Sequence, residues 1–129
     1  MAQDLWTVSY THLDVYKRQE HRYEEGYYDC SSLVQRLYQE VGISLPAIAS
    51  TQGEFMVTHG LEVTEGELEP GDLIFYSYEQ NGQFRNISHV AIYVGNGRMV
   101  HAANSRRGVV NDPFNPSNIG LYGRPSRLQ

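Results

Sequence analysis

The chain has 129 residues, of which 40% are hydrophobic and 19% charged, the balance expected of one globular domain with a packed core. Ten Lys and Arg residues against fifteen Asp and Glu residues give a net charge of −5, which argues against a protein that binds the phosphate backbone of nucleic acid. No apolar run approaches the length that spans a bilayer, so we predict no membrane insertion. The single cysteine excludes an internal disulfide.

The N-terminal segment shows no clear secondary-structure pattern. Residues 8–19 have neither helical nor strand periodicity, and they resemble a translated adapter sequence. Residues 1–6 lack the basic and apolar regions of a signal peptide. We therefore predict that residues 1–20 are non-native or disordered and that the functional domain comprises residues 21–129.

Two helices are predicted next. The first has an apolar stripe over about three turns, formed by Leu33, Val34, Leu37, Tyr38 and Val41. Gly42 is a helix stop, and Pro46 prevents any continuation. Ser50 or Thr51 is predicted to cap a second, shorter helix that runs towards residues 59–60.

Strand signals dominate the rest of the chain. Residues 70–72 (Pro-Gly-Asp) form a turn before an apolar strand at residues 73–76. Residues 88–94 and 98–103 predict the two strands of a hairpin around residues 95–97 (Gly-Asn-Gly). Helices followed by antiparallel strands define an α+β fold.

Three segments outside these elements carry weaker signals. The acidic stretch at residues 62–69 is predicted to be a solvated loop. Residues 111–118 are rich in Asn and Pro and predict a loop, which leads to a last short strand near residues 121–123.

The position of Cys30 suits a nucleophile. With Asp29 as the N-cap, Cys30 falls in the first turn of the helix, where unpaired N–H groups and the helix dipole favour a thiolate. Nucleophilic catalysis by cysteine also needs an imidazole within hydrogen-bond reach and a third polar group that orients this ring. The alternative for a lone cysteine is an inert, half-buried thiol.

Two histidines of the hairpin could complete such a site, depending on its turn. His89 begins one strand and shares a face with Ala91, while His101 lies in the other strand. A two-residue turn pairs His101 with Ile92 and places it on the opposite face. A three-residue loop, with Gly97 left-handed, pairs His101 with Ala91 and places it on the same face as His89.

The cysteine and the histidines are also compatible with other roles. Each histidine alone is compatible with a structural or surface role, and we assign that role to His12, His21 and His59, which have no partner pattern. A zinc site made of a cysteine and two histidines is a further alternative, but the sequence has no closely spaced ligand pair. We predict no metal.

Several motifs together resemble the NlpC/P60 family of cysteine peptidases, which have a papain-like core. The resemblance runs from about residue 27 to the C-terminus, and the motifs occur in the family's order. They are Asp29-Cys30-Ser31-Ser32-Leu33-Val34, Gly42-Ile43-Ser44-Leu45-Pro46, Leu68-Glu69-Pro70-Gly71-Asp72-Leu73-Ile74-Phe75, Ser88-His89-Val90-Ala91-Ile92-Tyr93-Val94-Gly95-Asn96-Gly97 and Val100-His101-Ala102.

The resemblance implies N-terminal helices packed on a central antiparallel sheet, and hydrolysis of peptidoglycan stem peptides next to D-γ-glutamyl. It implies Cys30 as nucleophile, His89 as general base and acid, and His101 as the residue that orients His89. Substrate binding would fall to residues beside the cysteine, namely Tyr28, Asp29 and Ser31. It further implies no cofactor, a monomer, and action outside the cell or in the cell wall.

The chain departs from the family pattern at three places. Ser32 replaces a glycine, Ala47 replaces an arginine, and the upstream Tyr-x-Trp-Gly-Gly segment is absent. Because this segment supplies a substrate-contacting tyrosine, we read the chain as a truncated gene joined to foreign sequence, with an incomplete substrate pocket. Two alternatives therefore stay open: a non-catalytic cell-wall-binding module, and a papain-like amidase or acyltransferase.

Overall fold

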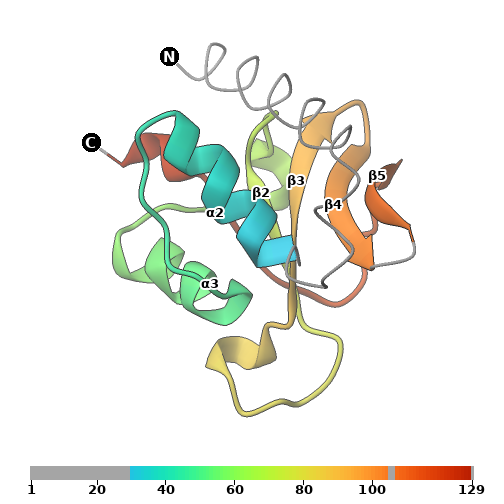
Figure 1. The fold of residues 1–129 in the computed structure, drawn as a ribbon. Helices are drawn as coiled ribbons and strands as arrows, with labels where there is room; N and C mark the ends of the chain where they lie inside the picture. Colours follow the sequence, from blue (N-terminus) through green and yellow to red (C-terminus); the bar gives the residue numbers. More distant parts are fainter. Residues whose placement is uncertain (1–29, 105–106, 129) are drawn as a thin grey trace.

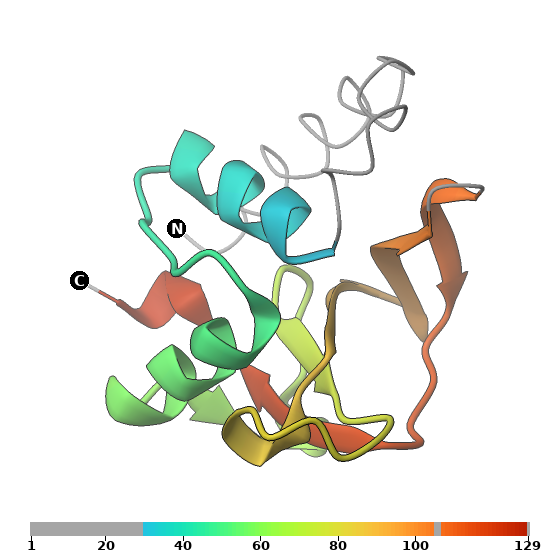
Figure 2. The same cartoon turned by 60° about the horizontal axis from the view of Figure 1, so that its bottom comes forward.

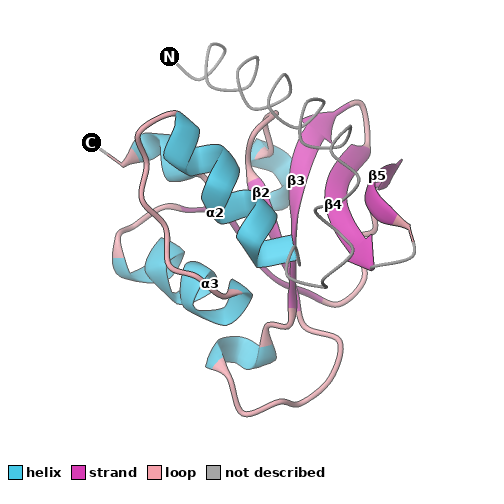
Figure 3. Cartoon of the chain, in the orientation of Figure 1, coloured by secondary structure: helices cyan, strands magenta, loops and turns pink. Residues whose placement is uncertain are grey.

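The computed structural model describes residues 30–104 and 107–128. Two helices come first, α2 (Cys30–Glu40) and α3 (Ala49–Thr58). One six-stranded sheet follows, made of β1 (Glu62–Val63), β2 (Leu73–Tyr76), β3 (His89–Gly95), β4 (Arg98–Asn104), β5 (Gly108–Pro113) and β6 (Ile119–Gly123). Figure 3 shows this division between helices and strands along the chain. Short 3₁₀ helices lie at Glu65–Glu67, Phe84–Asn86 and Pro125–Arg127.

The sheet is antiparallel throughout, in the order β1-β6-β2-β3-β4-β5. Helix α2 lies against β3 and β4, and α3 lies against β6 (Figure 1). After a turn of 60°, Figure 2 shows both helices on the same side of the sheet. The predicted α+β fold, with N-terminal helices packed on a central antiparallel sheet, is confirmed.

Each face of the sheet has its own apolar cluster. The helix side carries the apolar stripe of α2 together with alternate strand residues, such as Phe75, Val90 and Ile92. The other side gathers Val63, Ile74, Tyr76, Ala91, Met99 and Tyr122. This alternation has the period of two that strands impose, and it puts His89 on the side of Ala91, as expected.

The sequence predicted the end of α2 correctly, but not the start of α3. Gly42 follows α2 with φ of +86°, the left-handed conformation that glycine adopts without strain, so the predicted stop is confirmed. The predicted cap of α3 is wrong. Both Ser50 and Thr51 lie inside α3, the N-cap is Ile48 without a side-chain bond, and Thr51 Oγ1 donates to the Ile48 carbonyl at 3.0 Å.

The hairpin combines features of both predicted turns. Gly95 pairs with Arg98, so the turn itself has two residues, with Asn96 and Gly97 at φ of 55° and 69°. The register then shifts between Tyr93 and Gly95, where one extra residue forms a β-bulge, and Ile92 pairs with Val100. Continued by one residue, this register sets His101 opposite Ala91, the partner that we predicted for a three-residue loop.

Two segments predicted to be loops contain strands. Residues 111–113 belong to β5, although Asn, Asp and Pro are poor strand formers. They are tolerated because β5 is the edge strand of the sheet and Pro113 is its last residue. The acidic stretch holds β1 and a 3₁₀ helix that begins with a capping box between Thr64 and Glu67, although most of its side chains are exposed as expected.

Among the described residues, no helix is long and apolar enough to cross a membrane.

Candidate active site

Cys30 is the first residue of α2, and it lies beside the start of β3. Its side chain is 7% exposed and belongs to the apolar cluster on the helix side of the sheet. The Val90 N–H donates a hydrogen bond to Cys30 Sγ over 3.4 Å. The first turn of α2 is held by Gln52 of α3, whose Nε2 donates to the Ser31 carbonyl at 3.0 Å. The sulfur thus lies between the N-terminus of α2 and the backbone at the start of β3.

The two hairpin histidines form a direct hydrogen bond. His89 Nε2 and His101 Nδ1 are 2.8 Å apart, and the rings meet edge to face with centroids 4.9 Å apart. The bulge in β3 makes this possible, because it puts both side chains on one face of the sheet. Of the predicted catalytic residues, the structure therefore brings His89 and His101 together and places Cys30 against the residue that follows His89.

An acidic residue that the sequence analysis missed continues this chain of contacts. Asp112 of β5 lies opposite Met99, diagonal to His101, and its Oδ2 is 2.9 Å from His101 Nε2. Arg107 binds the same carboxylate with both terminal nitrogens, at 2.9 Å and 3.2 Å. The Arg107 hydrogen bonds, followed by that of His101, hold the pKa of Asp112 below its ordinary value of 3.8. Asp112 is therefore a carboxylate at neutral pH.

Aromatic side chains flank His89 on its other side. Tyr76, opposite His89 on β2, is fully buried, with its ring centroid 6.0 Å from the imidazole. Tyr78 stacks on Tyr76 at 5.5 Å and lies 6.1 Å from His89. The Tyr78 ring is 50% exposed, and partial burial raises its pKa, so its hydroxyl stays protonated at neutral pH. The only sign of Tyr78 in the sequence is its position two residues after Tyr76, the last residue of a buried strand.

The structure describes only one of the three predicted substrate-binding residues. Ser31 is 3% exposed in the first turn of α2. Tyr28 and Asp29 lie outside the described residues. Within the described ranges, no group of three or more His, Cys, Asp and Glu side chains is arranged to hold a metal ion.

The helices, the antiparallel sheet and the cysteine at the helix start define a papain-like fold. Residues 16–119 match the NlpC/P60 family, and the chain belongs to this family. The match begins at residue 16, inside the segment 1–20 that we predicted to be non-native or disordered. That statement about residues 1–20 stays a prediction.

The similar proteins include a peptidase and a peptidoglycan hydrolase. The chain is 33% identical over 101 residues to a γ-D-glutamyl-L-lysine dipeptidyl-peptidase of Bacillus cereus, a match that covers 78% of this chain and 28% of that protein. The structure resembles the peptidoglycan hydrolase RipB of Mycobacterium tuberculosis with a TM-score of 0.61 and 31% identity, over 75% of this chain and 44% of RipB. The chain thus spans less than half of either protein.

A further neighbour shows that the fold also occurs without catalysis. RipD of M. tuberculosis is a non-catalytic NlpC/P60 domain protein adapted to peptidoglycan binding. It matches with a TM-score of 0.61 and 26% identity, over 75% of this chain and 66% of RipD. Family membership alone therefore does not decide between hydrolysis and binding.

Proposed function

We propose that residues 21–129 form the catalytic domain of a cysteine endopeptidase that hydrolyses peptidoglycan stem peptides at the bond between D-γ-glutamyl and a diamino acid. The observation that carries this proposal is the bond between His89 and His101 at 2.8 Å, next to a cysteine at a helix N-terminus. A nucleophile, a base and a group that orients the base are the minimum for acyl transfer by cysteine. The similarity to a γ-D-glutamyl-L-lysine dipeptidyl-peptidase supports the substrate class.

In the first half of the reaction, Cys30 is acylated. His89 takes the thiol proton at Nδ1, and the thiolate attacks the γ-glutamyl carbonyl carbon. The tetrahedral oxyanion is held in part by the Cys30 backbone N–H at the start of α2. The C–N bond then breaks as His89 gives its proton to the leaving amine, which departs and leaves a thioester on Cys30.

In the second half, water clears the thioester. His89 accepts a proton from the water, whose oxygen attacks the thioester carbonyl, and the C–S bond breaks. The products are the free γ-carboxylate and Cys30, which takes back the proton from His89. All groups in this cycle belong to the chain and to the substrate, and the reaction would take place in the cell wall or outside the cell.

Purified protein incubated with defined muropeptides tests the proposal. Mass spectrometry should detect two new fragments, produced by cleavage at the γ-glutamyl bond, whose masses add up to the mass of the substrate plus one water. Cys30→Ala should release none, because the carbonyl loses its nucleophile. Absence of fragments from the unmodified protein would contradict the proposal, as would equal release by Cys30→Ala.

The same experiment distinguishes the rival functions. The similarity to RipD favours a binding module as the second candidate. A binding module would sediment with insoluble peptidoglycan and release no fragments. An amidase would cut the bond between sugar and peptide, and an acyltransferase would yield a product joined to an added amine, so the product masses separate these activities from endopeptidase activity.

A further inference from the structure

The contacts of His101 reach past the three residues of the proposed mechanism. One ring nitrogen, Nδ1, bonds His89 Nε2, and the other, Nε2, bonds Asp112 Oδ2 at 2.9 Å. Arg107, the residue just before β5, binds both oxygens of Asp112. The side chain of His101 is only 10% exposed and that of Asp112 23% exposed, so water competes weakly for these bonds. Both nitrogens of His101 thus have defined partners.

The chemistry of the partners decides where the hydrogens lie. An ionised carboxylate can only accept, so His101 Nε2 carries a hydrogen and donates it to Asp112. Neutral imidazole has one N–H, and this leaves His101 Nδ1 as an acceptor. The bond of 2.8 Å between His101 Nδ1 and His89 Nε2 then requires that His89 donate from Nε2. In neutral His89, the lone pair is therefore on Nδ1.

That tautomer of His89 is the one that can remove the proton of Cys30 through Nδ1. If His101 instead carried its hydrogen on Nδ1, it would donate to His89, and the hydrogen of His89 would move to its own Nδ1. A ring in that form cannot act as a base towards Cys30. We propose that Asp112, held by Arg107, is a positioning residue that sets the tautomer of His101 and, through it, the tautomer of His89. This inference rests on the function proposed above, with Cys30 as nucleophile.

The test compares Asp112→Asn with Arg98→Gln. Asparagine keeps the shape of the side chain, but its amide can donate to His101 Nε2 and so reverse both tautomers. Arg98 bonds Asn111 across the same two strands, at 2.8 Å and 2.9 Å, without touching either histidine. A role for Asp112 limited to joining β4 and β5 predicts similar effects of the two variants. The tautomer role predicts an effect of Asp112→Asn alone.

Two readouts are needed, kinetics on muropeptides and the ¹⁵N NMR shifts of the imidazoles. For Asp112→Asn we expect kcat to fall by about 100-fold or more with little change in KM, because the base is in the wrong form while the substrate contacts remain. The His101 hydrogen should move from Nε2 to Nδ1. For Arg98→Gln we expect kcat within about twofold of the unmodified protein and unchanged imidazole shifts.

The NMR measurement keeps the two proposals separable, because it needs no substrate. An inactive unmodified protein would contradict the endopeptidase proposal. The imidazole shifts would still test whether Asp112 sets the tautomers of the two histidines. If Asp112→Asn does not fold, the imidazole shifts of the unmodified protein test the inference on their own. A hydrogen on His101 Nδ1 at the working pH, alone or together with one on Nε2, would overturn the inference. Equal kcat in Asp112→Asn and the unmodified protein would also overturn it.

Discussion

Tyr78 is a half-exposed residue beside the proposed catalytic histidine, with ring centroids 6.1 Å apart. Its ring stacks nearly parallel on the buried Tyr76, with an interplanar angle of 10°, so its orientation is held from below. The residue as a whole is 50% exposed, and its ring is tilted at 32° to that of His89. An aromatic ring that is rigid on one side and open on the other is well suited to bind the apolar part of a peptide.

We therefore expect Tyr78→Ala to weaken substrate binding. The KM for a muropeptide should rise about tenfold, the equivalent of about 1.4 kcal/mol, with a smaller change in kcat. Tyr78→Phe is the matched control, because it keeps the stacked ring and removes only the hydroxyl, and its KM should stay within about twofold of the unmodified protein. A fall in kcat of Tyr78→Ala at constant KM would argue for a role in the chemical step instead.

At the scale of elements, α3 approaches β6 very closely where Met56 meets Gly123. Met56 of α3 is fully buried, and it lies directly over Gly123, the last residue of β6. A Cβ at position 123 would overlap the Met56 side chain. The strand cannot move away easily, because Gly123 pairs with both Leu73 and Glu62. The absence of a side chain at this position lets the helix approach the sheet.

Gly123→Ala should therefore destabilise the fold. We expect a loss of about 1–3 kcal/mol in the free energy of unfolding, the usual cost of adding a group to a packed core. Gly66→Ala is the matched control, because a Cβ there meets nothing within 4 Å. Its effect should be within about 0.5 kcal/mol, or slightly stabilising through the unfolded state. Urea unfolding of the two variants measures both values, and equal stabilities would refute the packing argument.

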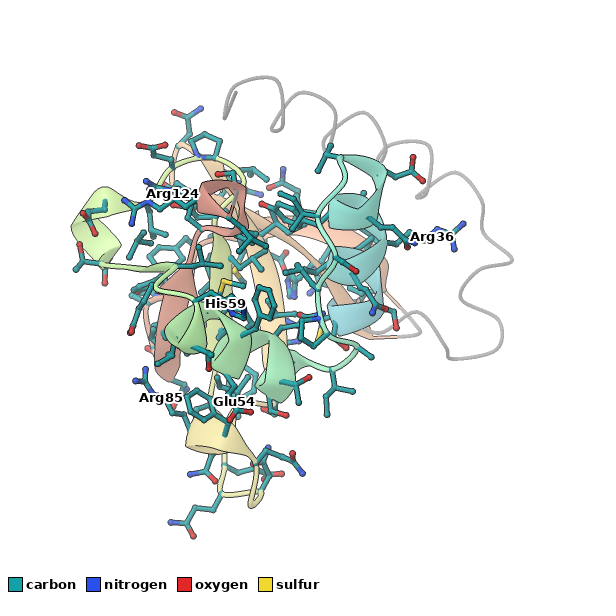
Figure 4. The ribbon with its side chains drawn as sticks, turned by 90° about the vertical axis from the view of Figure 1, so that its left-hand side faces the viewer. Arg36, Glu54, His59, Arg85 and Arg124 are labelled. Atoms are coloured by element: carbon teal, nitrogen blue, oxygen red, sulfur yellow. The ribbon has the colours of Figure 1, made fainter. Side chains whose placement is uncertain are left out.

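At the scale of the whole molecule, a buried ion pair joins segments far apart in the chain. Arg124, after β6, binds both oxygens of Asp72, before β2, at 2.8 Å and 2.9 Å, and it also donates to the Glu67 carbonyl at 2.6 Å. The side chain of Asp72 is 2% exposed and that of Arg124 is 12% exposed. Figure 4 shows Arg124 in the upper part of the view and Arg85, which pairs with Glu62 near the surface, in the lower part.

These two arginines allow a direct comparison between a buried and an exposed pair. Arg124→Gln leaves a buried carboxylate without its partner charge, and we expect a loss of about 3–5 kcal/mol in the free energy of unfolding. Arg85→Gln breaks a pair whose side chains are 42% and 44% exposed, and we expect a loss of about 0–1 kcal/mol. Thermal or urea unfolding checks both. Similar losses would mean that burial does not decide the strength of these pairs.

Local patterns in the sequence determined much of this fold. The apolar stripe of α2, the stop at Gly42 and the strand at Leu73–Tyr76 all follow from residues within a few positions of one another. The side on which His89 lies follows in the same way from strand alternation. Local signals sufficed because helix periodicity, strand periodicity and left-handed glycines are properties of short stretches of backbone.

Only the tertiary structure decided how the site is assembled. The bulge between Tyr93 and Gly95 sets the partner of His101, and a two-residue turn alone would have put that ring on the other face. Asp112 joins the histidines because β5 pairs with β4, although its own segment reads as a loop. Pairing between strands depends on contacts that the whole sheet selects together, so neither the bulge nor Asp112 is visible in the residues around it.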